Sequence, residues 1–173
     1  MSAEPKHSRL VRAVGEQDLD GIAAIYAHYV EHTYITFDTS APSPEEWRVK
    51  LRAAEREGHP WLLSEADGTL HGYALTFAFK SKPAYRFTLE TSIYLDPRSV
   101  GMGLGRELYE KALSDAGARG FHVAVAGIAL PNPRSVALHQ SLGFQPVGIF
   151  REVGHKLGDW RDVGWWQRPL SLT

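Results

Sequence analysis

The sequence predicts an α/β fold with a mixed sheet, and two observations lead to this prediction. First, Asp67 and Gly68 separate two apolar, β-prone runs, which is a strong signal for an antiparallel hairpin. Second, the chain beyond residue 95 continues as a glycine-rich loop, a helix, a buried strand and another helix. Hairpins that precede a strand-helix-strand-helix unit indicate one sheet with antiparallel and parallel pairs.

Local signals predict each element in order. Ser43 is a capping residue with Pro44 at the first helical position and Glu46 three residues after the cap, so a helix starts there and ends at Gly58. Pro83 breaks the chain before a further strand. Periodicity and breakers together predict a strand over 9–14, helices over 18–32 and 44–57, strands over 61–65, 70–79 and 87–95, a helix over 104–118, a strand over 123–130, a helix over 134–142, and strands over 147–153 and 162–167.

Composition limits the classes of function. A chain of 173 residues with 43% hydrophobic content is sufficient for one domain, and a net charge of −1 gives no general attraction to nucleic acid or to an anionic membrane. No apolar run approaches the roughly 18 residues that a membrane span needs. Residues 1–7 show no hydrophobic signal core, so we expect a cytoplasmic protein. The absence of cysteine excludes disulfides and a thiol nucleophile.

A glycine-rich loop precedes the helix over 104–118. Gly101, Gly103 and Gly105 alternate with other residues, which lets the backbone approach a ligand and turn its N–H groups toward it at a helix start. This pattern predicts a phosphate cradle; the alternative is a tight turn with nothing bound. Arg106 stands where a P-loop requires lysine, and the third glycine comes one residue early for a dinucleotide fingerprint, so both of those sites are excluded.

The order of motifs resembles the CoA-binding core of the Gcn5-related N-acetyltransferases, the GNAT family. The glycine loop and a second strand are followed by Asn132-Pro133-x-Ser135 and by Leu-His-Gln-Ser-Leu-Gly-Phe over 138–144. Other stretches resemble the phosphinothricin and methionine sulfoximine acetyltransferase branch, namely His28-Tyr29, Thr36-Phe37, 60–62, Ala84-Tyr85, 90–94, 130–132 and 158–164. The resemblance implies one N-acetyltransferase domain over 1–173, with a mixed, mostly antiparallel sheet, flanking helices and splayed central strands. It also implies acetyl-CoA as cosubstrate, a small-molecule amine as acceptor and a homodimer.

The resemblance also implies the cofactor contacts. Val100 stands where the family carries Gln or Arg, so we expect backbone amides, and not a side chain, to bind the pyrophosphate. Asn132 is expected either to bond the pantetheine arm or only to cap the next helix. The full set expected at the cofactor is Tyr94, Leu95, Gly101, Met102, Gly103, Leu104, Gly105, Arg106, Asn132 and Ser135.

Acetyl transfer to an amine needs a base, a donor to the thioester oxygen and a proton for the thiolate, and the sequence offers candidates for each. Glu90 shares one strand face with Ser92 and Tyr94. A lone strand glutamate is usually solvated, but Glu90 occupies the position that the resembled branch uses as general base through a water. The N–H near Leu95 is implied as donor to the thioester oxygen. His139 is placed where the family carries a Tyr that protonates the CoA sulfur, and it is alternatively a half-buried structural residue; Tyr94 is the other candidate donor, or a core residue.

The acceptor is expected beside Glu90. Lys80 and Lys82 are candidates to hold a substrate carboxylate, although the resembled branch commonly carries Arg at Lys82, and a solvated loop is the alternative. Phe37 and Tyr85 match aromatic positions of the acceptor pocket, or else belong to the core.

Other features point to structure or exclude chemistry. His28 and His32 are four residues apart on a helix, but no third ligand is evident, so no metal is expected. Trp160, Trp165 and Trp166 are interpreted as core or dimer-interface residues. Without cysteine or a serine elbow, direct transfer in a ternary complex is expected. The competing functions are acetylation of peptide or protein N-termini, and a non-catalytic acyl-CoA sensor.

Overall fold

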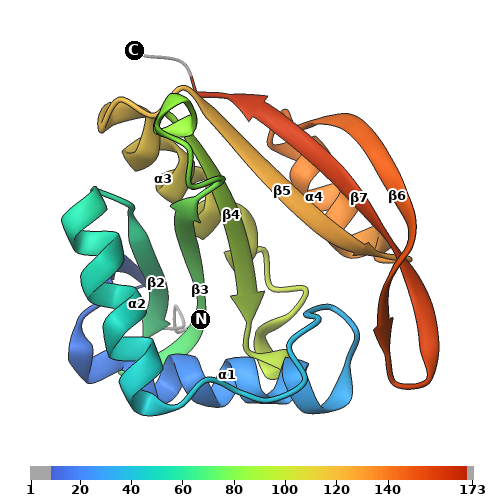
Figure 1. The fold of residues 1–173 in the computed structure, drawn as a ribbon. Helices are drawn as coiled ribbons and strands as arrows, with labels where there is room; N and C mark the ends of the chain where they lie inside the picture. The colour runs from blue at the N-terminus through green and yellow to red at the C-terminus, as the bar shows by residue number, and fades with distance from the viewer. Residues whose placement is uncertain (1–8, 171–173) are drawn as a thin grey trace, which may run out of the picture.

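In the computed structural model, which describes residues 9–170, one seven-stranded sheet carries helices on both faces (Figure 1). The strand order is β1-β2-β3-β4-β5-β7-β6, and β4 and β5 form the one parallel pair among the described strands. The elements are β1 (Arg9–Ala13), α1 (Leu19–His32), α2 (Pro44–Glu57), β2 (Trp61–Ala66), β3 (Thr69–Ala78), β4 (Thr88–Leu95), α3 (Leu104–Ala118), β5 (Val123–Leu130), α4 (Pro133–Ser141), β6 (Gln145–Lys156) and β7 (Asp159–Pro169). The predicted mixed, mostly antiparallel sheet is confirmed.

The caps that the sequence predicts are present in α2. The Ser43 hydroxyl accepts a hydrogen bond from the Glu46 amide at 3.3 Å, and the Glu46 carboxylate accepts one from the Ser43 amide at 2.7 Å. Gly58 ends the helix in the left-handed conformation with φ of 76°. These bonds satisfy backbone donors that the first turn of a helix leaves free, which explains why α2 starts at this residue.

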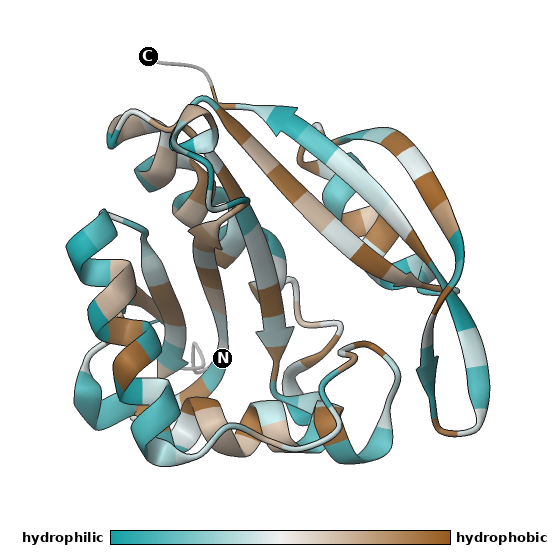
Figure 2. Ribbon diagram, viewed as in Figure 1, coloured by the Kyte–Doolittle hydropathy of each residue, from teal (hydrophilic) through white to brown (hydrophobic). Residues whose placement is uncertain are grey.

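The sheet separates two hydrophobic cores, because successive side chains of a strand point to opposite faces. Leu89 points to the face covered by α3, where it packs in one core with Leu108. Tyr73 and Trp47 belong to the other core, under α1 and α2, and Tyr94 packs against them. In Figure 2, hydrophobic colour alternates with paler and hydrophilic colour along the strands, and hydrophilic colour covers much of α2.

The two central strands separate toward one end of the sheet. Strand β4 pairs with β3 from Leu89 to Leu95, but it pairs with β5 only from Thr88 to Glu90. Beyond this point β5 continues beside β7, and Figure 1 shows β4 and β5 diverging. The splay that the family resemblance implied is therefore present, and it leaves one edge of each strand without a partner strand.

The hairpin of β6 and β7 is longer than the sequence predicted. Its turn consists of Leu157 and Gly158, with φ of 53° and 83°. Leucine rarely adopts a positive φ, so this turn carries no typical sequence signal. A bulge in β6 between Phe150 and Gly154 also interrupts the strand pattern, and Glu152 in that bulge has φ of 50°.

The sequence predicted neither a signal sequence nor a membrane span, and the structure bears only on the second of these. Residues 1–7, which we inspected for a signal sequence, lie outside the described residues. Within 9–170, the structure contains no helix with both the length and the apolar composition needed to cross a bilayer.

Candidate active site

Glu90 lies at the point where β4 and β5 separate. It forms the last pair of the parallel ladder, with Val125, and its side chain lines a cavity of about 630 Å³. Ser92 and Tyr94 line the same cavity, as the predicted strand alternation requires. Burial raises the pKa of Glu90, and the positive charge of Lys80 opposes this effect. Glu90 is thus a carboxylate of increased basicity at the junction of two open strand edges.

The cavity beside Glu90 is built from distant parts of the chain. Its wall combines the loop after α1, helix α2, strands β3 and β4, and the far arm of the sheet through Gly127 and Trp165. Three buried donors among its lining residues lack a hydrogen-bond partner in the described part of the chain: the indole N–H groups of Trp47 and Trp165 and the hydroxyl of Tyr73. These three atoms are themselves inaccessible from the cavity, so they lie behind its surface and do not define the chemistry of an occupant.

The open edge of β4 presents backbone donors. The Asp96 amide donates to the His71 carbonyl on β3 at 2.8 Å, so the amide of the preceding residue, Leu95, points to the opposite edge. The Leu95 carbonyl accepts a bond of 2.6 Å from the Tyr29 hydroxyl, outside the ladder with β3. By the same alternation, the Ile93 amide faces the gap between β4 and β5, beyond the end of the parallel ladder at Glu90. The structure therefore directs the predicted Leu95 donor into the opening.

A narrow space of about 50 Å³ lies inside this opening. It is lined by β4, by β5 and by the start of α4, and Tyr94 belongs both to this space and to the larger cavity. Burial raises the pKa of Tyr94 to about 12, although the Thr36 and Tyr26 hydroxyls favour its anion. A phenol with this pKa carries its proton at neutral pH. Tyr94 is therefore available as a proton donor between the two spaces.

His139 also lines the narrow space, but its ring is held on both sides. Its exposed fraction is 3%, Nδ1 lies 2.7 Å from the Ser135 carbonyl, and Nε2 lies 3.0 Å from the Tyr109 hydroxyl. A carbonyl only accepts, so Nδ1 carries the proton and Nε2 accepts from Tyr109. Burial lowers the pKa of His139, which keeps the ring neutral. The ring also contacts Phe144, which fits a structural residue. The role of His139 as proton donor remains a prediction.

The three glycines of the glycine-rich loop have different structural roles. Gly101 and Gly103 have φ of 90° and 76°, and nothing lies within 4 Å of the position that a Cβ would take at either residue. Gly105 lies inside α3, where a Cβ would be 3.2 Å from the Leu95 side chain. The first two glycines thus keep the start of α3 open, whereas the third allows α3 to pack on β4. Sequence reasoning had attributed all three to the ligand.

The other predicted cofactor residues lie around this loop. Met102 is exposed, and the Leu104 side chain is buried in the core, so Leu104 offers a ligand its backbone alone. The Arg106 guanidinium donates to the Ser141 carbonyl at 3.1 Å, consistent with contact to a phosphate through amides. Asn132 accepts from the Ser135 amide through Oδ1 at 3.2 Å and so caps α4, which leaves its NH₂ group as a donor.

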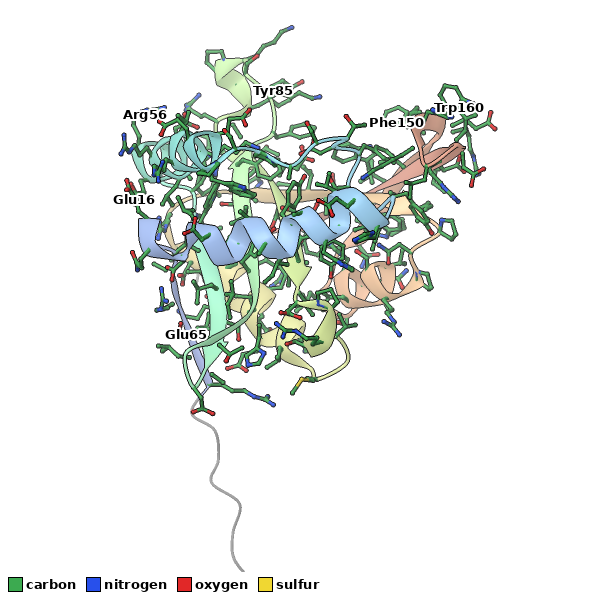
Figure 3. All side chains as sticks on the ribbon, turned by 90° about the horizontal axis from the view of Figure 1, so that it is seen from below. Glu16, Arg56, Glu65, Tyr85, Phe150 and Trp160 are labelled. Carbon is green, nitrogen blue, oxygen red and sulfur yellow. The ribbon has the colours of Figure 1, made fainter. Side chains whose placement is uncertain are left out.

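The predicted acceptor residues are only partly assembled. Phe37 lines the large cavity, and Lys80 acts on Glu90 through its charge. Lys80, Lys82 and Tyr85 are all absent from the cavity lining, and Figure 3 shows Tyr85 on a projecting loop. Their roles remain predictions. Trp165 was interpreted as structural, yet it lines the cavity.

The three tryptophans of β7 have three different environments. Trp166 is buried in the core and Trp160 is exposed, while Trp165 faces the cavity. Strand alternation at Trp165 and Trp166 was the sequence signal that could have separated their roles, since neighbours on a strand face opposite sides.

Residues 9–170 contain no group of three or more His, Asp or Glu side chains placed to hold a metal ion.

Several known proteins are similar to this chain in sequence and in fold. The profile of the acetyltransferase (GNAT) domain matches residues 11–165. A phosphinothricin N-acetyltransferase of Streptomyces coelicolor is 42% identical, over 92% of this chain and 95% of that protein. An L-methionine sulfoximine/L-methionine sulfone acetyltransferase of Salmonella typhimurium is 35% identical, over 93% and 94%. The crystal structure of a GNAT superfamily phosphinothricin acetyltransferase from Sinorhizobium meliloti in complex with acetyl-CoA matches with a TM-score of 0.91 and 34% identity, over 94% of this chain and 89% of that one. The chain therefore belongs to the GNAT acetyltransferase family.

Proposed function

We propose that this protein transfers the acetyl group of acetyl-CoA to the amine of a small amino-acid analogue of the phosphinothricin or methionine sulfoximine type. The observation that carries the proposal is the position of Glu90, where the β4–β5 ladder ends and the large cavity meets the open strand edges. A base at this junction reaches an amine in the cavity and a thioester in the gap. The Streptomyces and Salmonella relatives named above supply the class of acceptor.

The residues around the gap suit acetyl-CoA. The amides of Ile93 and Leu95 offer an extended chain a row of donors, and the open start of α3 at Gly101 and Gly103 suits a pyrophosphate. Asn132 lines the narrow space between the strands, and its NH₂ group is available as a donor. When bound, acetyl-CoA supplies an electrophilic thioester carbonyl and a thiolate leaving group.

Glu90 would remove the proton that the amine loses. Its raised pKa matches the task, because a base is most effective when its pKa lies near the working pH. The α-amino group of a peptide has an ordinary pKa of about 7.7 to 8.0, and the amine of a free amino acid is more basic, so most of the acceptor carries the extra proton at pH 7. Glu90 and the orientation of the amine in the cavity would act together to present the neutral amine to the thioester.

Negative charge also develops on the thioester oxygen and on the departing thiolate, and each has a hydrogen donor nearby. The Leu95 amide points into the gap and would donate to the carbonyl oxygen as negative charge develops on it. Tyr94 borders both spaces with its proton in place, so we assign to it the proton that the thiolate takes up. His139 would instead hold α4 through its two ring bonds.

We infer direct transfer in a ternary complex. The chain has no cysteine, and no serine lies in a nucleophile elbow, so a covalent acetyl-enzyme lacks an evident nucleophile. The large cavity and the narrow gap meet at Glu90 and Tyr94, which would place both substrates side by side.

The lining of the cavity also supports a small acceptor. The wall formed by the loop after α1 closes this cavity on one side. An enclosing wall favours a small acceptor over a peptide, which needs an open groove.

We further propose that the protein acts as a homodimer through β6. Strand β6 is the outer edge of the sheet, and Val147, Ile149, Phe150 and Val153 are exposed on it. Trp160 lies with Phe150 at the same side of the molecule (Figure 3). An exposed apolar edge strand favours pairing with another chain.

We also propose that residues 1–173 form one acetyltransferase domain that acts in the cytoplasm. The continuous sheet from β1 to β6 supports a single unit. Acetyl-CoA carries several charges that do not enter hydrocarbon readily, so its use favours the compartment in which it is made.

Release of free CoA from acetyl-CoA tests the function. The panel contains phosphinothricin, methionine sulfoximine, methionine sulfone, polyamines and peptides. The proposal predicts turnover that is fastest on the amino-acid analogues. Faster turnover on peptides would favour N-terminal acetylation, whereas tight acetyl-CoA binding without any turnover would favour an acyl-CoA sensor.

A further inference from the structure

Residues 33–38 cross from α1 to the outer hairpin over the mouth of the gap (Figure 1), and we call this segment the 33–38 loop. On the side of α1, the Tyr26 hydroxyl donates to the Asp38 carboxylate and accepts from the Thr36 hydroxyl, each at 2.7 Å. Tyr26 also packs against Trp47 and Tyr94. One end of the loop is therefore bound to the β4 arm of the sheet.

The other arm of the sheet binds the same loop. Lys156 of β6 donates from Nζ to the Thr36 carbonyl at 2.7 Å, and its exposed fraction is 6%. The Phe37 ring contacts the backbone of Gly154, where any Cβ would overlap the ring. Tyr34 donates to the Pro131 carbonyl at 2.7 Å, and the Arg161 guanidinium lies 4.1 Å from its ring centre.

The bulge in β6 explains why these groups face the loop. Residues 145–153 of β6 are exposed, but Gly154 and Lys156 are buried. The register shift between Phe150 and Gly154 re-aims the end of the strand toward the 33–38 loop. The bulge thus separates an exposed stretch of β6 from the stretch that contacts the loop.

A buried lysine at this place calls for a reason beyond packing. Lysine is rarely buried, because removal of its charge from water is costly. Its carbonyl partner belongs to Thr36, and Ile35, Thr36 and Phe37 all line the large cavity. Lys156 itself is absent from the cavity lining, so it would act on an acceptor only through the loop.

We propose that Lys156 is a positioning residue, which holds the 33–38 loop as a wall of the acceptor cavity and thereby sets acceptor affinity without touching either substrate. This rests on the proposed acetyltransferase function. Because the loop contacts both arms of the sheet, Lys156 couples the outer hairpin to the acceptor site.

The test compares Lys156→Met with a matched control. Methionine keeps an unbranched stem but has no donor for the Thr36 carbonyl. Lys111→Met removes an exposed lysine of α3 whose partner is Asp115, so it controls for loss of charge. The readouts are hydrogen exchange of the 33–38 amides, the KM and kcat for the fastest acceptor of the wild-type enzyme, and the Kd of acetyl-CoA.

The proposal predicts a selective effect. In Lys156→Met, exchange rises in the 33–38 loop, and the acceptor KM increases about tenfold while kcat and the acetyl-CoA Kd stay within about threefold. The control behaves as wild type. Since the chain has no cysteine, Lys156→Cys labelled with bromoethylamine restores an ammonium at one position and should restore KM.

Three results would overturn the proposal. They are unchanged exchange in the loop, an acceptor KM that rises no more than the acetyl-CoA Kd, and a labelled Lys156→Cys enzyme that remains impaired. Hydrogen exchange needs no turnover, so the loop is tested even if the panel shows no acetylation. If Lys156→Met does not fold, Gly154→Ala displaces Phe37 while retaining the lysine, and it should also raise acceptor KM selectively.

Discussion

Replacement of Glu90 by glutamine removes the proposed base with little change in shape. Glu90 keeps its backbone pairs with Phe77 and Val125, because these do not involve the side chain. The charge that acts on its carboxylate is that of Lys80, so the substitution disturbs mainly one electrostatic contact. The variant should therefore fold and bind acetyl-CoA.

The expected loss of activity follows from the role of the base. General base catalysis contributes about 10²- to 10⁴-fold. The cavity at Glu90 is large enough for water to carry a proton, which places Glu90→Gln at the lower end, with kcat reduced about 10²- to 10³-fold. The assay is CoA release across pH, with acetyl-CoA affinity measured by calorimetry.

The pH profile carries a second signature. Burial raises the pKa of Glu90, so wild-type kcat should fall as pH decreases through this raised value, and Glu90→Gln should lose that limb. A reduction in kcat of less than about tenfold, or an acid limb that persists in the variant, would refute the role of Glu90 as base.

The thermal stability of Glu90→Gln should rise, whereas its activity falls. A carboxyl whose pKa is raised by folding destabilises the folded state above its ordinary pKa, because its ionised form is the one that burial disfavours. Glu90→Gln should therefore raise Tm near neutral pH, and the difference should vanish in acid, where Glu90 is protonated in both states. An equal or lower Tm at neutral pH would contradict this assignment of the pKa shift.

Four further substitutions test the glycine loop, the proton donor and the dimer edge. Gly103→Val forces a β-branched residue to a φ of 76° and should weaken acetyl-CoA binding about tenfold or more in calorimetry, with the fold retained by circular dichroism. Tyr94→Phe should lower kcat about 10- to 100-fold with cofactor affinity unchanged, whereas His139→Ala should mainly lower Tm, because it removes the partner of two buried groups. Trp160→Asp should convert a dimer to a monomer in light scattering.

Each of these expectations has a clear contrary result. Unchanged acetyl-CoA affinity in Gly103→Val would separate the glycine loop from the cofactor. A loss of kcat confined to His139→Ala would move the proton donor from Tyr94 to His139. A wild-type protein that is already monomeric would remove β6 as a dimer edge.

The fold was largely predictable because local signals agreed along most of the chain. The capping box at Ser43 sets the start of α2, and Asp67 and Gly68 form the turn between β2 and β3. Both depend on backbone geometry that few residue types provide. The turn at Leu157 and Gly158 was missed because its leucine at positive φ matches no common turn pattern. The extent of β6 was hidden by its bulge and its exposed apolar residues.

The site was predictable only where one strand defines it. Glu90, Ser92 and Tyr94 share a face by strand alternation alone. Trp165 and the 33–38 loop enter the cavity through tertiary contacts with residues far away in sequence, which periodicity does not encode. Lys156 gave no sequence signal, since its burial depends on the register of a bulged hairpin.

A crystal structure with CoA and an acceptor amine would show whether the two substrates meet at Glu90. We expect the pantetheine arm between β4 and β5, the pyrophosphate at the amides of residues 101–106, and the amine in the large cavity within reach of Glu90. CoA bound outside this opening, or an amine on the far side of the sheet from Glu90, would contradict this arrangement.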